Sequence, residues 1–196
     1  MKTSKKGVDI IHAAEAFRAF AYPDPASKLY KASPRQRWGF RPASEILGAL
    51  STETRKLSGA PWTVGWGETR GVTKDTRMTR DEADVAFAAS LYEFERAVES
   101  AVRGAAGGTT QGQFDAMVSL TYNIGIAAFR KSSILRNHLK GDFAAAARSF
   151  HLYNQAGGKQ MPGLVKRRAA ESAHYLSDMR LPQPLLPQPL LSRTAE

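Results

Sequence analysis

The chain has 196 residues, of which 42% are hydrophobic, enough for one core and for two lobes that share a helix. It has no cysteine, which excludes disulfide bonds and thiolate catalysis. Its formal net charge of +10 favours polyanions: nucleic acid, anionic membranes or the anionic polymers of a cell wall. Charge alone does not choose among them, and solubility with nonspecific attraction is the plainer interpretation.

The N-terminus is basic, like the start of a signal peptide. Asp9, His12 and Glu15 interrupt the segment that follows, so it lacks the apolar stretch that such a peptide needs. No later segment is apolar enough to span a bilayer. We therefore expect no built-in export route and no stable membrane insertion.

The apolar residues of segment 7–21 recur at helical spacing, which predicts a first helix there. Pro23 and Pro25 end it, because the residue before a proline is pushed out of the helical region. Strong helix formers dominate the rest of the chain as well, so a mainly helical protein is expected.

Segment 26–61 begins irregular and basic and contains one short predicted helix, after Pro42. The next segment, Trp62 to Val72, combines glycines with β-branched and aromatic residues. This composition predicts a small hairpin.

Two capping boxes mark the starts of longer helices. In Thr79-Arg-Asp-Glu82 and in Thr110-Gln-Gly-Gln113, the first and last side chains satisfy free backbone donors of a helix start. The first box opens a long amphipathic helix that should end near Gly104 and join the two lobes.

Three shorter helices are predicted after these, from about residue 133 to before Gly141, through the alanines to about 153, and from about 164 to 179. Segment 181–191 then doubles a Leu-Pro-Gln-Pro-Leu unit, which proline keeps out of helices and central strands. We expect one domain over 1–180 and an extended or disordered tail over 181–196.

Glu15, Asp24 and Thr63 are the candidate catalytic residues. Taken singly, each has an ordinary interpretation: a solvated helix carboxylate, a turn residue between two prolines, and a strand threonine. Together, however, they form a pattern: Glu15 and Asp24 come first, and Thr63 begins the sequence Thr-Val-Gly-Trp-Gly. This pattern resembles the Glu–Asp–Thr triad of the phage-type lysozymes. This family (glycoside hydrolase family 24) includes phage T4 lysozyme and many endolysins.

The resemblance extends beyond the triad. Segments 113–125, 129–133, 153–159 and 163–171 resemble the core helix, the following turn and the C-terminal lobe of this family, in the same order. The resemblance implies an α+β, mainly helical, lysozyme-like fold with two lobes. A small β-hairpin lobe and a helical C-terminal lobe would be joined by a long helix.

The family's activity implies a peptidoglycan muramidase that hydrolyses the β-1,4 bond between N-acetylmuramic acid and N-acetylglucosamine with inversion. Glu15 would be the acid that protonates the leaving oxygen, and Asp24 and Thr63 would hold a water on the opposite face of the sugar. Inversion needs carboxyl groups roughly 6.5–9.5 Å apart. No metal and no cofactor is required. Tyr122 and Ser132 fall where relatives contact the glycan, with core packing and helix capping as the plainer alternatives.

The largest departure from the family is the insertion 26–61, where relatives have a very short loop between the aspartate and the threonine strand. It puts Asp24 in question, because Glu45 or Glu53 could enter the cleft instead. Loop closure entropy grows slowly with length, so Asp24 and Thr63 can still meet. We expect the insertion to form a small helical subdomain on the cleft lobe that extends the binding surface.

Glu68 is the second departure, since many relatives have histidine there. We expect it to form an ion pair with Arg70 or Arg77, as pairs of this kind are common near turns. Trp38 and Trp66 could stack on sugars, but a role in the core is at least as consistent with their type.

The leading hypothesis is a phage endolysin that stays in the host cytoplasm until a separate pore admits it to the wall. A virion-associated lysozyme, a lytic transglycosylase and a catalytically silent wall-binding protein are alternatives. Membrane damage by a basic amphipathic segment at 164–175 is another. The expected partners are peptidoglycan glycan strands and, through the basic surface, anionic envelope polymers. No nucleic-acid-binding signature is present, and a monomer is expected.

Overall fold

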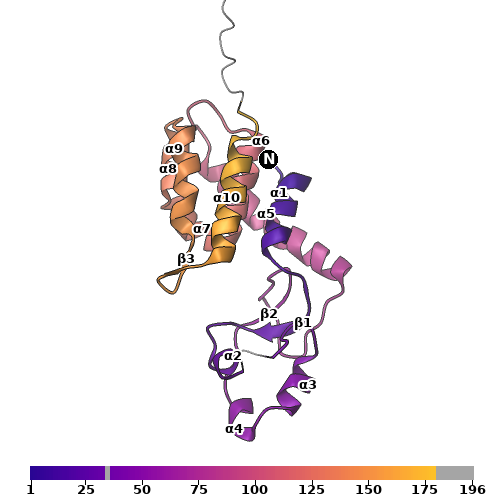
Figure 1. Ribbon diagram of the computed structural model, residues 1–196. Helices are drawn as coiled ribbons and strands as arrows, with labels where there is room; N and C mark the ends of the chain where they lie inside the picture. The colour runs from indigo at the N-terminus through magenta and orange to yellow at the C-terminus, as the bar shows by residue number, and fades with distance from the viewer. Residues whose placement is uncertain (34–35, 180–196) are drawn as a thin grey trace, which may run out of the picture.

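The computed structural model describes residues 1–33 and 36–179. It consists of a helical body and a smaller part built around a two-stranded sheet, which lies below the body in Figure 1. The elements in chain order are α1 (Lys5–Ala14), β1 (Arg18–Pro23), α2 (Lys28–Ala32), α3 (Ala43–Gly48), α4 (Thr52–Arg55), β2 (Trp62–Gly65), α5 (Arg80–Ala101), α6 (Gln111–Ile124), α7 (Ile126–Arg130), α8 (Ser133–Leu139), α9 (Phe143–Ser149), the 3₁₀ helix η1 (Phe150–Tyr153), β3 (Gln155–Ala156), β4 (Lys159–Gln160) and α10 (Pro162–Leu176). The mainly helical α+β class predicted from the sequence is confirmed.

Both predicted capping boxes are present. The Thr79 side chain accepts from the backbone N–H of Glu82, whose carboxylate accepts from the backbone N–H of Thr79, and Thr110 and Gln113 make the same exchange at α6. Helix α5 begins beside the sheet and runs into the helical body, where it packs on α6 (Figure 1). The long helix therefore joins the two parts.

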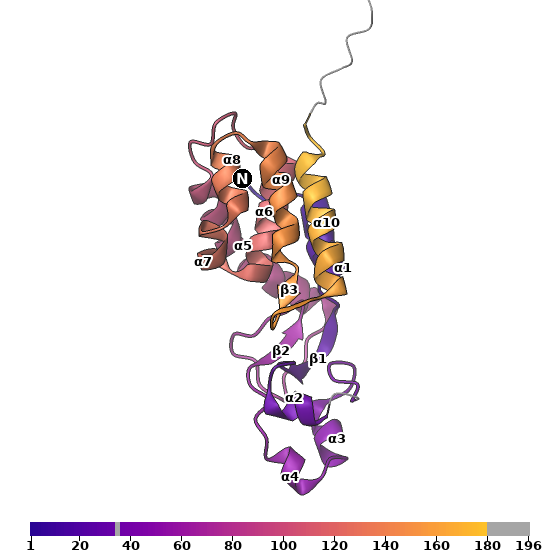
Figure 2. The same cartoon turned by 60° about the vertical axis from the view of Figure 1, so that its left-hand side comes forward.

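Helix α6 is the centre of the helical body, with α1, α5 and α10 packed on it (Figure 2). Its residues from Gly112 to Thr121 are all buried, as expected for a helix with neighbours on every side. The largest fully buried apolar side chains of the body come from five different elements, namely Ile11, Phe114, Phe129, Phe150 and Tyr175. Burial of this apolar surface is the main stabilising contribution to the body.

The first helix is shorter than predicted. It ends at Ala14, and Glu15 already has an extended backbone (φ −101°, ψ 99°). The aromatic run that follows forms strand β1, in which Tyr22 faces Thr63 of β2. Short apolar runs fit a helix or a strand, and here tertiary pairing decides in favour of the strand. Glu15 consequently stands where the chain leaves the helical body and enters the sheet.

The predicted hairpin over 62–72 is present only as a single antiparallel bridge between Val64 and Glu68. Strand β2 pairs with β1, and after it the chain turns so tightly that Val64 bridges Glu68. Gly65 has φ +64°, and a Cβ on it would lie 3.0 Å from the Cβ of Ala83 in α5. Glycine at this position thus permits both the turn and the contact between sheet and helix.

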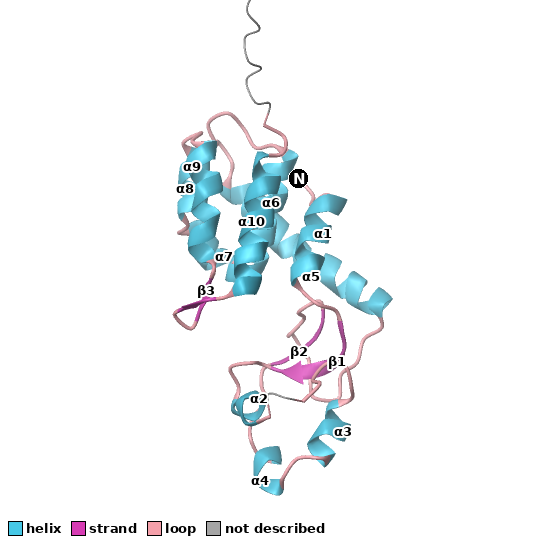
Figure 3. Cartoon of the chain, viewed as in Figure 1, coloured by secondary structure: helices cyan, strands magenta, loops and turns pink. Residues whose placement is uncertain are grey.

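The described residues of the insertion 26–61 form three short helices, α2, α3 and α4, of which the sequence predicted only α3 (Figure 3). They enclose a second small hydrophobic core made of Leu29, Trp38, Ala43 and Ile46. Tyr22 of β1 and Trp62 of β2 pack against this core, so the insertion rests on the sheet.

The C-terminal helices α8, α9 and α10 confirm the predictions within a few residues, although α10 ends at Leu176 rather than at 179. Helix α7 and the small β3–β4 hairpin were not predicted. The predicted tail 181–196 lies outside the described residues. Within 1–33 and 36–179, every helix is too short or too polar to cross a membrane.

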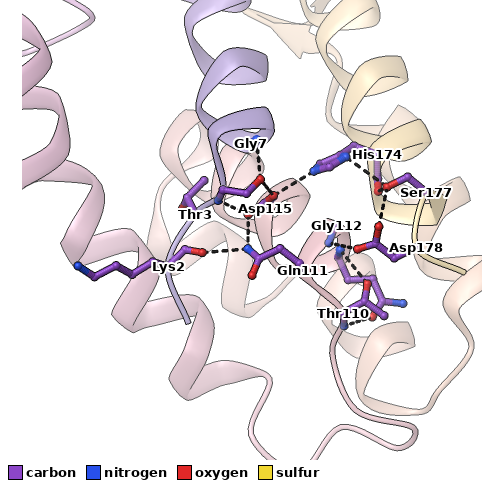
Figure 4. Close-up of polar contacts among 12 residues, drawn as sticks. Lys2, Thr3, Gly7, Thr110, Gln111, Gly112, Asp115, His174, Ser177 and Asp178 are labelled. Atoms are coloured by element: carbon purple, nitrogen blue, oxygen red, sulfur yellow. Dashed lines mark hydrogen bonds and ion pairs between the residues drawn. The ribbon is translucent and has the colours of Figure 1, made fainter.

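Asp115 of α6 ties the N-terminal segment to the helical body (Figure 4). Its buried carboxylate accepts hydrogen bonds from the backbone N–H of Ser4 (2.9 Å) and from the Gln111 side chain (2.7 Å), and His174 Nε2 of α10 lies 3.0 Å away. Gly7 allows this approach, because a Cβ there would lie 2.7 Å from the Asp115 carboxyl carbon. The start of α1 is thereby fixed against α6 and α10.

Candidate active site

Glu15 lies at the C-terminal end of α1 with its side chain 27% exposed. Its Oε1 accepts a hydrogen bond of 2.6 Å from Nη1 of Arg167 in α10, a guanidinium that is only 3% exposed. Both residues line a hollow of about 870 Å³ between α1 and α10, whose other walls include Asn123, Met161 and Leu164. The carboxylate therefore has one oxygen fixed by a buried cation and lies beside a space large enough for a ligand.

Arg167 is itself held from three sides. Its Nε lies 3.1 Å from Oε1 of Glu171, and its Nη2 donates to the backbone carbonyl of Ser119 at 3.1 Å. Glu171 is fully buried and also pairs with Arg168 at 3.1 Å. Burial raises the pKa of Glu171, and the two arginines oppose this rise. Two cations and two carboxylates thus balance, which is the condition under which buried charges are tolerated.

Thr63 and Tyr22 face each other across β1 and β2. Burial raises the pKa of the Tyr22 phenol, and the negative charges of Glu15 and Asp24 add to this effect. Tyr22 is therefore close enough to both carboxylates to sense their charge. The candidate Thr63 is the strand partner of this tyrosine.

Asp24 directly follows β1, at the base of the insertion. Its backbone N–H bonds to the carbonyls of Gly59 (3.2 Å) and Pro61 (3.0 Å), and Pro23 pairs with Trp62. The two ends of the insertion are thus joined where it leaves the sheet, and its length does not separate Asp24 from the strand of Thr63. Asp24 also has a turn role, since its Oδ1 accepts from the Ala26 N–H at 2.6 Å.

Gly67 and Tyr122 complete the surroundings of Glu15. A Cβ on Gly67 would lie 3.4 Å from the Tyr122 hydroxyl and 3.9 Å from Oε2 of Glu15. The Tyr122 hydroxyl donates to the backbone carbonyl of Trp66 at 3.1 Å. Burial raises the pKa of Tyr122, and the charges of Glu68 and Glu15 contribute. The glycine-rich turn after β2 therefore lies next to the second oxygen of Glu15, and glycine at position 67 places no side chain against it.

A family model described as phage lysozyme matches residues 46–171, well over half of the chain. The chain belongs to the phage lysozyme family. This match includes Thr63, Tyr122 and Arg167 but begins after Glu15 and Asp24.

Several curated relatives of this phage lysozyme family member are endolysins. The chain is 38% identical over 117 residues to the endolysin of Bacillus phage PZA, covering 59% of this chain and 44% of the relative. It is 28% identical to the endolysin of Bacillus phage B103, covering 90% and 55%. It is 32% identical to the endolysin of Acyrthosiphon pisum secondary endosymbiont phage 1, covering 59% and 80%. The chain thus spans about half the length of the two Bacillus phage relatives.

Two solved structures support the same assignment over most of the chain. The muramidase domain of SpmX from Asticaccaulis excentricus matches with a TM-score of 0.68 and 27% identity, covering 90% of this chain and 98% of that one. The endolysin from Escherichia coli O157:H7 phage FAHEc1 matches with a TM-score of 0.66 and 28% identity, covering 90% and 94%. The lysozyme-like fold predicted from the sequence is confirmed.

Other residues considered from the sequence have structural roles. Ser132 is 2% exposed, and its hydroxyl caps α8 by accepting from the Leu135 N–H at 3.1 Å. Its contact with glycan stays a prediction. Trp38 and Trp66 are 4% and 3% exposed, so both belong to the interior.

The ion pair predicted for Glu68 does not form among the described residues. Its carboxylate accepts a hydrogen bond of 2.6 Å from Ser90 of α5, whereas Arg70 lies 3.6 Å from Glu93. The tight turn at Val64 directs Glu68 toward α5 instead of toward the neighbouring arginines. It therefore joins the sheet to the long helix.

Arg167 is the site residue that the sequence did not single out. It was part of a family-like segment, but two adjacent arginines on an amphipathic helix ordinarily suggest a solvated or membrane-facing surface. Burial of Arg167, Arg168 and Glu171 in the helical body contradicts the idea that segment 164–175 is a free amphipathic surface. The spacing of Arg167 and Glu171, four residues apart, was the available signal.

Proposed function

We propose that this phage lysozyme family member is a peptidoglycan muramidase that hydrolyses the β-1,4 bond between N-acetylmuramic acid and N-acetylglucosamine. The observation that supports it most is the carboxyl of Glu15, which has one oxygen bound to buried Arg167 and the other beside Gly67. Membership of the phage lysozyme family and the names of its endolysin relatives support the same activity.

Glu15 is the proposed acid that protonates the leaving oxygen. The guanidinium of Arg167 can only donate, so when Glu15 is neutral its proton is carried by Oε2, the oxygen near Gly67. That oxygen has no contact with Arg167, so it is the one proposed to face the leaving oxygen of the sugar. Glu171 offsets the positive charge of Arg167. Arg167 can therefore orient the Glu15 carboxyl without being an uncompensated buried cation.

Asp24 and Thr63 are proposed to hold the attacking water on the opposite face of the sugar, which leads to inversion. Support comes from the closed base of the insertion, which keeps Asp24 next to the strand of Thr63. Tyr122 and Ser132 are the proposed glycan contacts, and the insertion is proposed to extend the binding surface from the sheet. No metal or cofactor takes part in this scheme.

The test compares muropeptide release from purified peptidoglycan by the wild type and by Glu15→Gln, with mass analysis of the new ends. The amide cannot donate a proton of comparable acidity, so we expect a loss of at least about 100-fold, the usual scale for a general acid. New reducing N-acetylmuramic acid ends from the wild type alone would support the proposal. Anhydro ends would indicate a transglycosylase, and no release by either protein would indicate a wall-binding protein.

The biological setting is proposed as host lysis by a monomeric endolysin that reaches the wall from the host cytoplasm through a separate pore. The endolysin names of the relatives favour this route over a virion-associated enzyme. Immunoblotting of purified virions distinguishes the two, because only a virion-associated enzyme would be present in them. The basic surface is proposed to bind anionic envelope polymers.

A further inference from the structure

One group of exposed basic side chains in the helical body gathers around a single hollow. Segment 116–141 contains no acidic residue. Four basic side chains within it surround a hollow of about 620 Å³ on α7 and α8, namely Arg130, Lys131, Arg136 and Lys140. All four are exposed, and Leu135 and Leu139 supply the apolar part of the lining. We refer to this feature as the basic hollow.

Within 1–33 and 36–179, no ion pair neutralises the charge of the basic hollow. Its lining contains no carboxylate. The nearest acids along the chain are engaged elsewhere: Asp115 is fully buried, and Asp142 caps α9 by accepting from Ala145. All ion pairs found within 1–33 and 36–179 involve other cations. Four like charges around one hollow repel each other, and a bound polyanion would relieve that repulsion.

We propose that the basic hollow binds a phosphate-bearing polymer of the bacterial envelope that is attached to the same wall as the glycan. This inference rests on the proposed action on peptidoglycan and names a second partner for it. The planar guanidinium groups of Arg130 and Arg136 match pairs of phosphate oxygens, and the two lysines add point charges. Repeated phosphodiesters suit a surface with four cations better than a single carboxylate does.

The shape of the feature favours a polymer over a lipid surface. Leu135 is 6% exposed and Leu139 is 37% exposed, so Leu139 is the one exposed large apolar side chain in the lining. A membrane-binding surface instead presents large apolar side chains next to its basic residues. A concave basic surface with a small apolar floor accommodates a flexible charged chain.

The position of the hollow connects it with the wall glycan. Figures 1 and 2 both place α7 at the end of the helical body that faces the sheet. The lining also includes Ser132, which was predicted to contact glycan. The hollow therefore begins at the end of the body nearer to the sheet and continues along α8.

The experiment measures co-sedimentation of the full chain with insoluble walls at low salt, before and after phosphate polymers are removed with hydrofluoric acid. The test variant is Arg136→Gln/Lys140→Gln. The matched control, Lys2→Gln/Arg103→Gln, removes the same net charge from two exposed residues that lie beside Glu95 and Glu99. We expect about a tenfold weaker binding to intact walls for the test variant alone, since each cation near an anionic surface contributes modestly. On stripped walls all proteins should bind equally weakly.

Three results would overturn the inference. Equal losses in both double variants would mean that only net charge matters. Unchanged binding of the wild type after stripping would exclude the phosphate polymer. If the test variant lost binding to anionic phospholipid vesicles but kept its binding to walls, the hollow would be a lipid-binding site. Arg130→Gln, which removes a cation from the other end of the hollow, repeats the measurement in case the double variant fails to fold.

Muropeptide release from stripped walls, measured in parallel, separates this inference from the proposed activity. No release from any wall, together with a selective binding loss in the test variant, would contradict the muramidase and leave the polymer site supported. Normal release, together with unchanged wall binding in the test variant, would support the muramidase and contradict the polymer site.

Discussion

Arg167 is the residue at which the position of the acid and the stability of the fold can be separated. Its three nitrogens contact Glu15, Glu171 and the carbonyl of Ser119, which a single ammonium cannot do at once. Arg167→Lys should therefore lower kcat by up to about 100-fold, the cost of a misplaced catalytic group. Arg167→Met, which leaves Glu171 with one arginine fewer, should also cost about 3–5 kcal/mol of stability.

These variants are measured by the initial rate of muropeptide release at saturating substrate and by urea unfolding. Arg148→Lys on α9 is the control, because Arg148 is exposed, and both quantities should stay unchanged. A normal kcat for Arg167→Lys would show that Glu15 does not depend on the guanidinium.

His138 makes the folded state sensitive to acid. It is fully buried between Tyr175 (2.6 Å) and Thr109 (2.9 Å), and burial lowers its pKa from 6.5 to about 4. The unfolded chain therefore takes up a proton near its ordinary pKa, whereas the folded chain does so only near pH 4. The stability is fully present above about pH 6.5 and falls by about 3 kcal/mol as the pH drops toward 4.

His138→Gln should be less stable at neutral pH but should lose less stability on acidification. Urea unfolding at about pH 7 and about pH 4.5 measures the difference. His151→Gln is the matched control, since His151 is exposed. An acid-dependent loss that is the same in both variants would assign the effect to carboxylates instead.

At the scale of elements, Asp115 fixes α1 to the body. Its partners are donors from the N-terminal segment, α6 and α10 (Figure 4). Asp115→Asn would direct an N–H group toward one of these donors, at a cost of about 3 kcal/mol. Hydrogen exchange of the Val8 amide, which bonds to the Ser4 carbonyl, should accelerate more than that of amides in α5.

The control is Asp9→Asn, which removes an exposed ion pair with Lys5 and should change stability by less than about 0.5 kcal/mol. Equal exchange rates at Val8 in wild type and Asp115→Asn would mean that the packing of α1, and not the carboxylate, holds the helix start.

Sequence signals within a few residues correctly predicted where helices begin. They did not predict the features that depend on contacts between segments far apart in the chain. The capping boxes at Thr79 and Thr110 depend on residues three apart, so they were predictable and are present. The end of α1 at Ala14 depends on the pairing of β1 with β2, about forty residues away, which periodicity does not encode.

The residues of the candidate site likewise fall into those that the sequence predicted and one that it did not. Glu15, Asp24 and Thr63 were predicted from their types and order, and their catalytic roles stay predictions. Arg167 escaped notice because the burial of an arginine follows from how α10 packs on α6, and no composition rule predicts a buried cation. Asp24 was in question because a long insertion could have displaced it from the sheet. Its backbone hydrogen bonds to Gly59 and Pro61 explain how it stays beside the sheet.

At the scale of the whole molecule, the two parts are joined by α5, which contacts β2, and by the chain at Glu15, which leads from α1 into β1. Residues from both parts surround Glu15: Tyr22 and Gly67 come from the sheet side, and Tyr122 and Arg167 from the body. A site of this kind depends on the relative position of two cores that are otherwise separate.

The net charge of +10 acts on the encounter with the wall and not on the chemistry at Glu15. The screening length falls from about 10 Å at 0.1 M salt to about 3 Å at 1 M. Lysis of whole walls should therefore slow about fivefold or more across this range. Cleavage of a short, soluble glycan fragment by the same protein should change little, because its binding involves few distant charges. Turbidity loss of wall suspensions and chromatography of the fragment measure the two rates. If both rates fell together, salt would be acting on the site itself, through the ion pair of Arg167 with Glu15, and the basic surface would have no separate role in wall binding.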